Sequence, residues 1–162
     1  MTGVQTCALP IYTSKNEKDR SVKCFLRDKA GNLWIGGDFG LKKFSSDEHL
    51  LKFWSLEDIY KSINVNGGIA SIEDAGNGKL WIGNWGGGLS IFDPQTGINI
   101  QYNEFLKSKT QNGNCILNIV KKEEILFLFT FEGIAQFNSK TLEVEWFSHE
   151  KSGPAPAAPP RR

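Results

Sequence analysis

Histidine and cysteine are scarce in this chain of 162 residues, which has two of the former and three of the latter. His49 and His149 have no cysteine or histidine at the spacing that metal ligands require. The sequence therefore predicts no metal site, and it contains no motif that binds another cofactor.

Long apolar runs are also missing, because none approaches the ~20 residues of a transmembrane helix. No basic segment precedes an apolar one near the start, so no signal peptide is predicted in this segment. Neither sign of charge dominates, since 19 Lys and Arg stand against 18 Asp and Glu. This balance gives no electrostatic footprint for nucleic acid or for an anionic membrane.

The motifs of catalysis are missing as well. There is no Walker sequence, nucleophile elbow or zincin pair. The glycines at 86–88 link two expected strands and do not precede a helix, so they are not a phosphate loop. Asp28 and Asp74 occupy matching turns, where a carboxylate has a structural role. The sequence therefore predicts no catalytic residue and no enzyme activity in this chain.

What the chain does have is a repeat. Two copies share Asp, a turn with Gly and Asn, the letters LWIG, then Gly-Leu and Phe; they begin at Asp28 and Asp74. A third copy keeps Gly133-Ile134 and a following Phe, but lacks the Asp and the Trp. The copies are 47 and 46 residues apart, from Trp34 to Trp81 and on to Phe127. A strand-rich period in the forties is typical of propeller blades.

Each copy contains four short apolar runs separated by turn residues, which indicates a four-stranded antiparallel sheet. We therefore expect an all-β fold: a partial β-propeller of about three such blades from a larger ring. Helix is expected nowhere except a turn near Leu56 to Lys61. Trp34 and Trp81 are expected to pack between blades. Cys24 and Cys115 lie in the first runs of non-adjacent blades, too far apart for a disulfide.

The expected organisation has five parts. Residues 1–11 resemble a translated sequencing adapter, and the tail is rich in Pro, Ala and Arg, unlike the rest of the chain. The parts are an artefactual or disordered leader at 1–18, blade 1 at 19–63, blade 2 at 64–108, a degenerate blade 3 at 109–150, and a disordered or chimeric tail at 151–162. Three blades are less than a full ring, so the sequence is interpreted as a fragment.

The D-x-x-G-N-L-W-I-G pattern, followed by Gly-Leu and an aromatic residue, resembles the two-component regulator propeller repeat. That resemblance implies the sensor region of a bacterial hybrid two-component system. It also implies a periplasmic location, an oligosaccharide ligand, further blades, a histidine kinase in the parent protein and a possible dimer. Two alternatives stay open: a fragment of a propeller enzyme, such as a lyase or hydrolase, and a protein-interaction propeller.

A ligand is expected at one face of the propeller. The loops between second and third strands open on the same face as the connections between blades at 55–68 and 103–114, and loops that converge favour binding. Trp85, in a glycine-rich loop, either contacts a ligand or packs locally. The candidate ligand-binding residues are Asp38, Phe39, Asn84, Trp85 and Glu132, with Phe131 beside the last.

Overall fold

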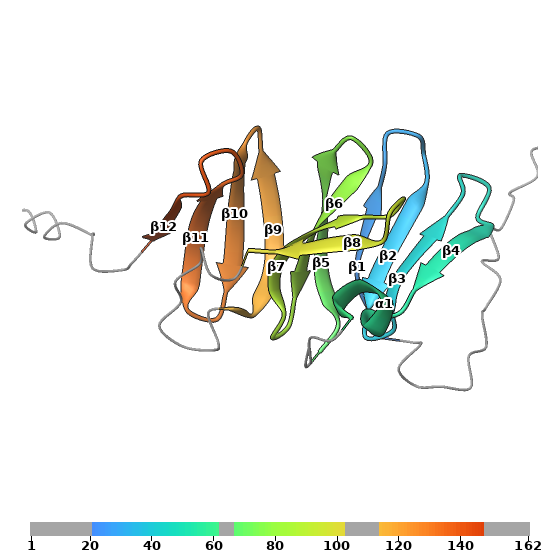
Figure 1. Ribbon diagram of the computed structural model, residues 1–162, viewed down its shortest axis with the longest axis horizontal. Helices are drawn as coiled ribbons and strands as arrows, with labels where there is room; N and C mark the ends of the chain where they lie inside the picture. Colours follow the sequence, from blue (N-terminus) through green and yellow to red (C-terminus); the bar gives the residue numbers. More distant parts are fainter. Residues whose placement is uncertain (1–20, 62–66, 103–113, 148–162) are drawn as a thin grey trace, which may run out of the picture.

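The structure is a computed structural model that describes residues 21–61, 67–102 and 114–147 (Figure 1). The predicted leader at 1–18 and tail at 151–162 lie outside the described residues. So do residues 62–66 of the connection at 55–68 and residues 103–113 of the connection at 103–114.

Twelve strands in the described part form three four-stranded sheets. Blade 1 consists of β1 (Val22–Arg27), β2 (Leu33–Gly37), β3 (Gly40–Phe44) and β4 (Leu50–Trp54). Blade 2 consists of β5 (Ile69–Gly76), β6 (Lys79–Asn84), β7 (Gly88–Asp93) and β8 (Ile98–Gln101). Blade 3 consists of β9 (Ile116–Lys122), β10 (Ile125–Thr130), β11 (Gly133–Asn138) and β12 (Val144–Phe147).

Within each blade, every strand pairs antiparallel with its neighbour in sequence, so each blade is a simple meander. The sheets stand side by side in chain order, with β1, β5 and β9 next to one another (Figure 1). The prediction of an all-β partial propeller with three four-stranded blades is therefore confirmed. The expected turn is the helix α1 (Leu56–Tyr60), which begins with a capping box between Ser55 and Asp58.

The turn between the first two strands shows how the repeat works. The Asp28 carboxylate accepts hydrogen bonds from the backbone amides of Ala30 and Asn32, and from the Trp34 indole at 3.0 Å. One side chain thus fixes both the turn and the tryptophan. Asp74 in blade 2 accepts from the Gly76 amide, and that turn is built on positive-φ residues 76–78.

The core lies between the blades. One buried cluster joins blades 1 and 2 around Trp34, and a second joins blades 2 and 3 around Trp81. Trp34 stacks on Trp54 with ring centroids 5.8 Å apart, and Trp81 meets Tyr102 edge-on at 5.4 Å. Each repeat tryptophan therefore packs against an aromatic residue at the end of its own blade, as well as against the next blade.

The glycine two residues after each repeat tryptophan lets the next blade approach. A methyl group on Gly36 would lie 2.7 Å from Ile69 Cγ2, and one on Gly83 would lie 2.6 Å from Ile116 Cγ2. Blade 3 has Phe129 at this position, and its side chain is 36% exposed. The third copy therefore differs from the other two on the face that it turns away from blade 2.

Candidate functional site

The antiparallel meander places the loops between second and third strands at one end of all three sheets. In blade 1 this loop carries Asp38, whose carboxylate forms an ion pair with Lys23 Nζ at 2.6 Å. The Lys23 ammonium, and then the Ser21 hydroxyl, hold the pKa of Asp38 below its usual range. Asp38 is therefore ionised at neutral pH, and its charge is partly neutralised by Lys23.

The Lys23 ammonium also lies 5.0 Å from the centroid of the Trp85 ring in blade 2. Trp85 in turn contacts the ring of Phe131 in blade 3, at a centroid distance of 5.7 Å. These four residues, Asp38, Lys23, Trp85 and Phe131, form a continuous row that we call the three-blade strip. Trp85 is 44% exposed and Phe131 is 58% exposed, so the strip offers aromatic surface to solvent.

The backbone around Trp85 is held in place. Its amide donates to the Gly68 carbonyl at 3.3 Å, and Gly67 packs so closely that a methyl group there would lie 2.6 Å from Trp85 Cβ. Asn84 is fully buried; its Oδ1 accepts from the Gly87 amide at 2.9 Å and its Nδ2 donates to the Gly67 carbonyl. The buried Asn84 side chain therefore holds the Trp85 loop against the backbone at Gly67.

The five predicted site residues fall into two groups. Asp38, Trp85 and Glu132 have side chains that reach solvent, and the Glu132 amide donates to Thr130 Oγ1. Phe39 is buried with the Lys42 ammonium 4.3 Å from its ring, and Asn84 is buried under the Trp85 loop. Phe39 and Asn84 therefore pack inside the loop face and support its shape, while ligand contact by the five residues stays a prediction.

Sequence reasoning missed Lys23. It lies in β1, where the pairing with β2 shifts register between Val22 and Cys24. A bulge of this kind changes where a side chain points, and the strand alternation of the sequence gives no sign of it. The sequence does show that Lys23 lies near the start of a first strand, and the start of that strand is at the same end of the sheet as the Asp38 loop.

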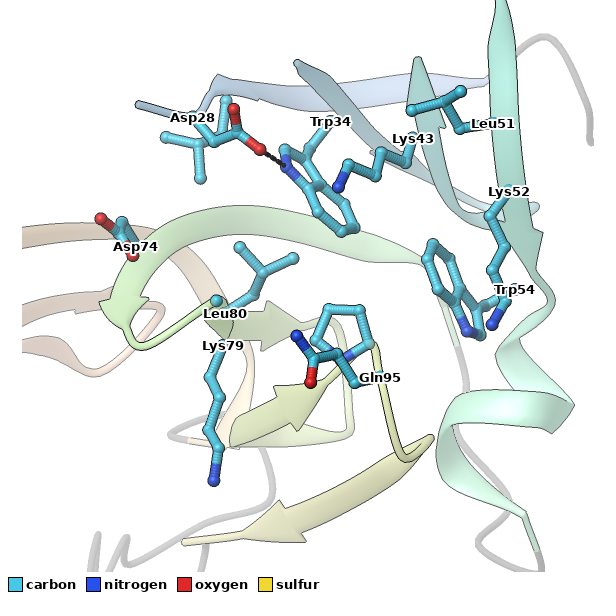
Figure 2. Close-up of a pocket in the computed structure, with 13 residues that line it drawn as sticks. Asp28, Trp34, Lys43, Leu51, Lys52, Trp54, Asp74, Lys79, Leu80 and Gln95 are labelled. Atoms are coloured by element: carbon cyan, nitrogen blue, oxygen red, sulfur yellow. Dashed lines mark hydrogen bonds between the residues drawn. The ribbon is translucent and has the colours of Figure 1, made fainter. Parts of the chain in front are cut away.

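A cleft of about 360 Å³ lies at the other end of the sheets, between blades 1 and 2 (Figure 2). It is lined by Leu26, Asp28, Trp34, Lys43, Leu51, Lys52, Trp54, Asp74, Gly78, Lys79, Leu80, Pro94 and Gln95. Asp28 and Asp74, which the sequence places in structural turns, both line this cleft.

No group of three or more His, Cys, Asp or Glu side chains in ranges 21–61, 67–102 and 114–147 is arranged to hold a metal ion. In the same ranges, no helix has the length and apolar character needed to cross a membrane.

Comparison with known proteins supports the repeat. The family model described as two component regulator propeller matches residues 16–39. No curated protein matches the chain.

Among solved structures, the chain is similar to the extracellular domain assigned to the hybrid two component system BT3049 of B. thetaiotaomicron. The identity is 23% and the TM-score 0.62, over 82% of this chain and 18% of the other. For the extracellular domain assigned to BT4673 of the same organism, the identity is 18% and the TM-score 0.60, and the match covers 81% of this chain and 16% of the other. For PorZ, a surface component of the type-IX secretion system of Porphyromonas gingivalis, the identity is 11% and the TM-score 0.56, and the match covers 78% of this chain and 16% of the other.

These likenesses show the fold, and the chain spans less than a fifth of the solved chains that it matches. The match at residues 16–39 covers the Asp28 turn and the LWIG strand that hold blade 1 together. This chain is thus a three-blade stretch of β-propeller, and residues 16–39 at its first blade match the family model described as two component regulator propeller.

Proposed function

We propose that this chain is part of the ligand-sensing β-propeller of a hybrid two-component sensor. In this proposal the segment lies in the periplasm, binds an oligosaccharide and passes the signal to a histidine kinase elsewhere in the parent protein. The parent also supplies the remaining blades, and it works as a dimer. The chain itself is a binding segment and not an enzyme.

The observation that carries the proposal is the three-blade strip. It joins the loops of three blades through one ion pair, one cation–π contact and one ring–ring contact. A ligand that touches Trp85 also touches groups held by blades 1 and 3, so binding is coupled to the relative position of the blades. The extracellular domains among the similar solved structures support a location outside the cytoplasm.

Exposed aromatic rings beside charged groups suit sugar binding. The apolar face of a pyranose stacks on an indole, and the Asp38 carboxylate and Lys23 ammonium provide a hydrogen-bond acceptor and donors for hydroxyl groups. The strip is therefore matched to an oligosaccharide that lies across the blade boundaries.

The test is a calorimetric titration of the chain with a panel of oligosaccharides, followed by Trp85→Ala. Loss of the stacking ring is worth ~1 kcal/mol or more, so the affinity for any oligosaccharide that binds is expected to fall about fivefold to tenfold. The same variant in the full-length parent is expected to weaken ligand-dependent reporter output.

Phe53→Ala is the matched control, because Phe53 is exposed to nearly the same extent, 45% against 44% for Trp85, and lies in β4, which contributes no residue to the strip. It is expected to leave the affinity unchanged. Equal affinities for Trp85→Ala and the unaltered chain would exclude the strip as the sugar site. The absence of any binding in the panel would count against an oligosaccharide ligand.

A protein-interaction propeller is the second candidate. The observation that favours it is that Trp85 and Phe131 lie against each other on exposed loops, whereas the cleft of Figure 2 is at the other end of the sheets. A photoreactive residue at position 131 of the parent protein separates the two candidates. Cross-linking to another protein, without sugar binding, would favour this second function.

A further inference from the structure

The cleft between blades 1 and 2 contains two ammonium groups that contact aromatic rings but are not paired with a carboxylate in the described part of the chain. Lys43 Nζ lies 4.8 Å from the centroid of the Trp34 ring, and Lys52 Nζ lies 4.9 Å from that of Trp54. In the described ranges 21–61, 67–102 and 114–147, neither ammonium has a carboxylate within ion-pair distance. Figure 2 shows both amines beside the tryptophan pair.

Two other lysines around the cleft, Lys29 and Lys79, form ion pairs with aspartates. Lys29 pairs with Asp74 at 3.6 Å, and Lys79 pairs with Asp93 at 3.8 Å. In Figure 2 the Lys79 side chain extends away from the tryptophan pair. The cleft therefore has two cations, Lys43 and Lys52, whose charges are available to a ligand.

Asp28 is the other carboxylate that lines the cleft, and its oxygens accept hydrogen bonds from neutral donors in its own turn and from the Trp34 indole. Burial alone would raise its pKa, but hydrogen bonds from Asn32 and Trp34 outweigh burial and keep the pKa below its usual range. Asp28 is therefore an anion at neutral pH. One anion bonded to its own turn does not neutralise two ammonium groups, so the net charge of the unpaired groups is positive.

The walls of the cleft are apolar. Leu26, Leu51, Leu80 and Pro94 line it beside the two indoles. Its volume of about 360 Å³ is within the range of small-molecule sites, which start at ~300 Å³ and combine apolar walls with a few placed polar groups. A bare inorganic ion would leave these walls without a contact, whereas a ring of monosaccharide size would cover them.

We infer that this cleft binds a small ring-bearing carboxylate, with Lys43 and Lys52 on the carboxylate and the leucine and tryptophan side chains against the ring. The site is separate from the three-blade strip, because the meander places the two at opposite ends of the sheets. Charge-assisted hydrogen bonds to a carboxylate are the strongest that such a site offers.

The experiment is a calorimetric titration of the full chain with four probes: D-glucuronate, benzoate, D-glucose and acetate. Glucuronate or benzoate is expected to bind at least about tenfold more tightly than both glucose, which lacks the charge, and acetate, which lacks the ring. Comparison of the two ring acids identifies whether the ring is a sugar or an aromatic one. Equal affinity for all four probes, or no binding of either ring acid, would overturn the inference.

Variants locate the site. The double substitution Lys43→Gln with Lys52→Gln is expected to weaken binding of the ring acid at least about tenfold, and Lys43→Arg with Lys52→Arg is expected to restore it. Lys140→Gln is the control, since it removes one positive charge from the exposed pair with Glu124 in blade 3. Unchanged affinity in the double Gln variant, with an unaltered thermal melt, would show that the acid binds elsewhere.

Discussion

At the scale of single residues, the buried aromatic side chains have very different polar surroundings. The Trp34 indole donates to Asp28, so its polar atom is satisfied. The Tyr60 hydroxyl is buried without a hydrogen-bond partner in the described part of the chain. Ser90 and Asn84 lie near it, and burial raises the pKa of Tyr60, but neither neighbour is placed to bond the hydroxyl.

Tyr60→Phe is therefore expected to leave the free energy of unfolding unchanged or to raise it by about 1 kcal/mol, because it removes an unpaired buried polar group that costs ~1–3 kcal/mol. Urea denaturation measures this. Tyr60→Ala, in contrast, is expected to cost ~3–5 kcal/mol through the cavity that it leaves. A loss of more than about 1 kcal/mol in Tyr60→Phe would mean that the hydroxyl has a partner, such as a buried water.

Cys24 shows how burial controls reactivity. Its thiol packs beside Gly36 and donates to the Ile69 carbonyl at 3.7 Å. Burial raises the pKa of Cys24 to about 12, so it is protonated at neutral pH. Cys24 and Cys115 are not joined to each other by a disulfide, as their places in non-adjacent blades predict.

At the scale of elements, the contact between blades depends on one glycine in each sheet. Gly36 and Gly83 are equivalent, and each faces the isoleucine that begins the next blade. Because the two isoleucines are branched side chains inside buried clusters, they have little room to move. A sheet that packs on the outer face of blade 3 needs a smaller residue opposite Phe129 than Ile69 or Ile116.

Gly83→Ala is expected to destabilise the chain by ~1–3 kcal/mol, since the new methyl group would overlap Ile116 in a packed core. Equilibrium unfolding in urea gives the magnitude. Gly83→Ala combined with Ile116→Ala tests the cause, because the second change removes the clashing Cγ2. The two substitutions are expected to be non-additive, and strict additivity would contradict the proposed overlap.

At the scale of the whole molecule, ionised carboxylates stabilise the fold at neutral pH. In the described part of the chain, pKa values lie below their usual range for Asp28, Asp38, Asp47, Asp58, Asp93 and Glu124. A carboxylate with a depressed folded-state pKa stabilises the protein above the unfolded-state pKa, and this stabilisation is lost as the pH falls through the folded-state pKa. Glu73 opposes them, because burial raises its pKa.

The melting temperature is therefore expected to be steady near neutral pH and to fall below about pH 4, the range in which free aspartates titrate. Asp28→Asn is expected to be less stable at neutral pH and to lose less on acidification, since it removes one of these groups together with its bonds to the turn. Thermal melts from about pH 7 to about pH 2.5 measure both effects. A variant with the same acid dependence as the unaltered chain would argue against Asp28 as a contributor.

The two outer sheet faces are apolar, and no blade in the described part of the chain packs against them. On blade 1 the face includes Phe25, which is 75% exposed, and Phe53. The opposite face, on blade 3, carries Val120, Phe129, Ile134 and Phe147. Apolar surface of this extent promotes association.

The isolated chain is therefore expected to associate with rising concentration or to unfold with poor cooperativity. Sedimentation velocity over a concentration series measures the association. Phe129→Lys is expected to reduce it, whereas Phe131→Lys, at the loop end, is expected to leave it unchanged. A monodisperse monomer with a sharp two-state melt would contradict this expectation.

The sequence by itself determined the fold class, the blade period and the burial of Trp34 and Trp81, because a repeat imposes the same local pattern of strands and turns on each copy. It also located the loop end where Asp38 and Trp85 lie. Only the tertiary structure decided which side chains meet there. Lys23 joined the strip through a bulge, Asn84 and Phe39 turned inward, and the Lys43 and Lys52 cleft formed between two blades. These features depend on contacts between residues of different sheets, which spacing along one chain does not encode.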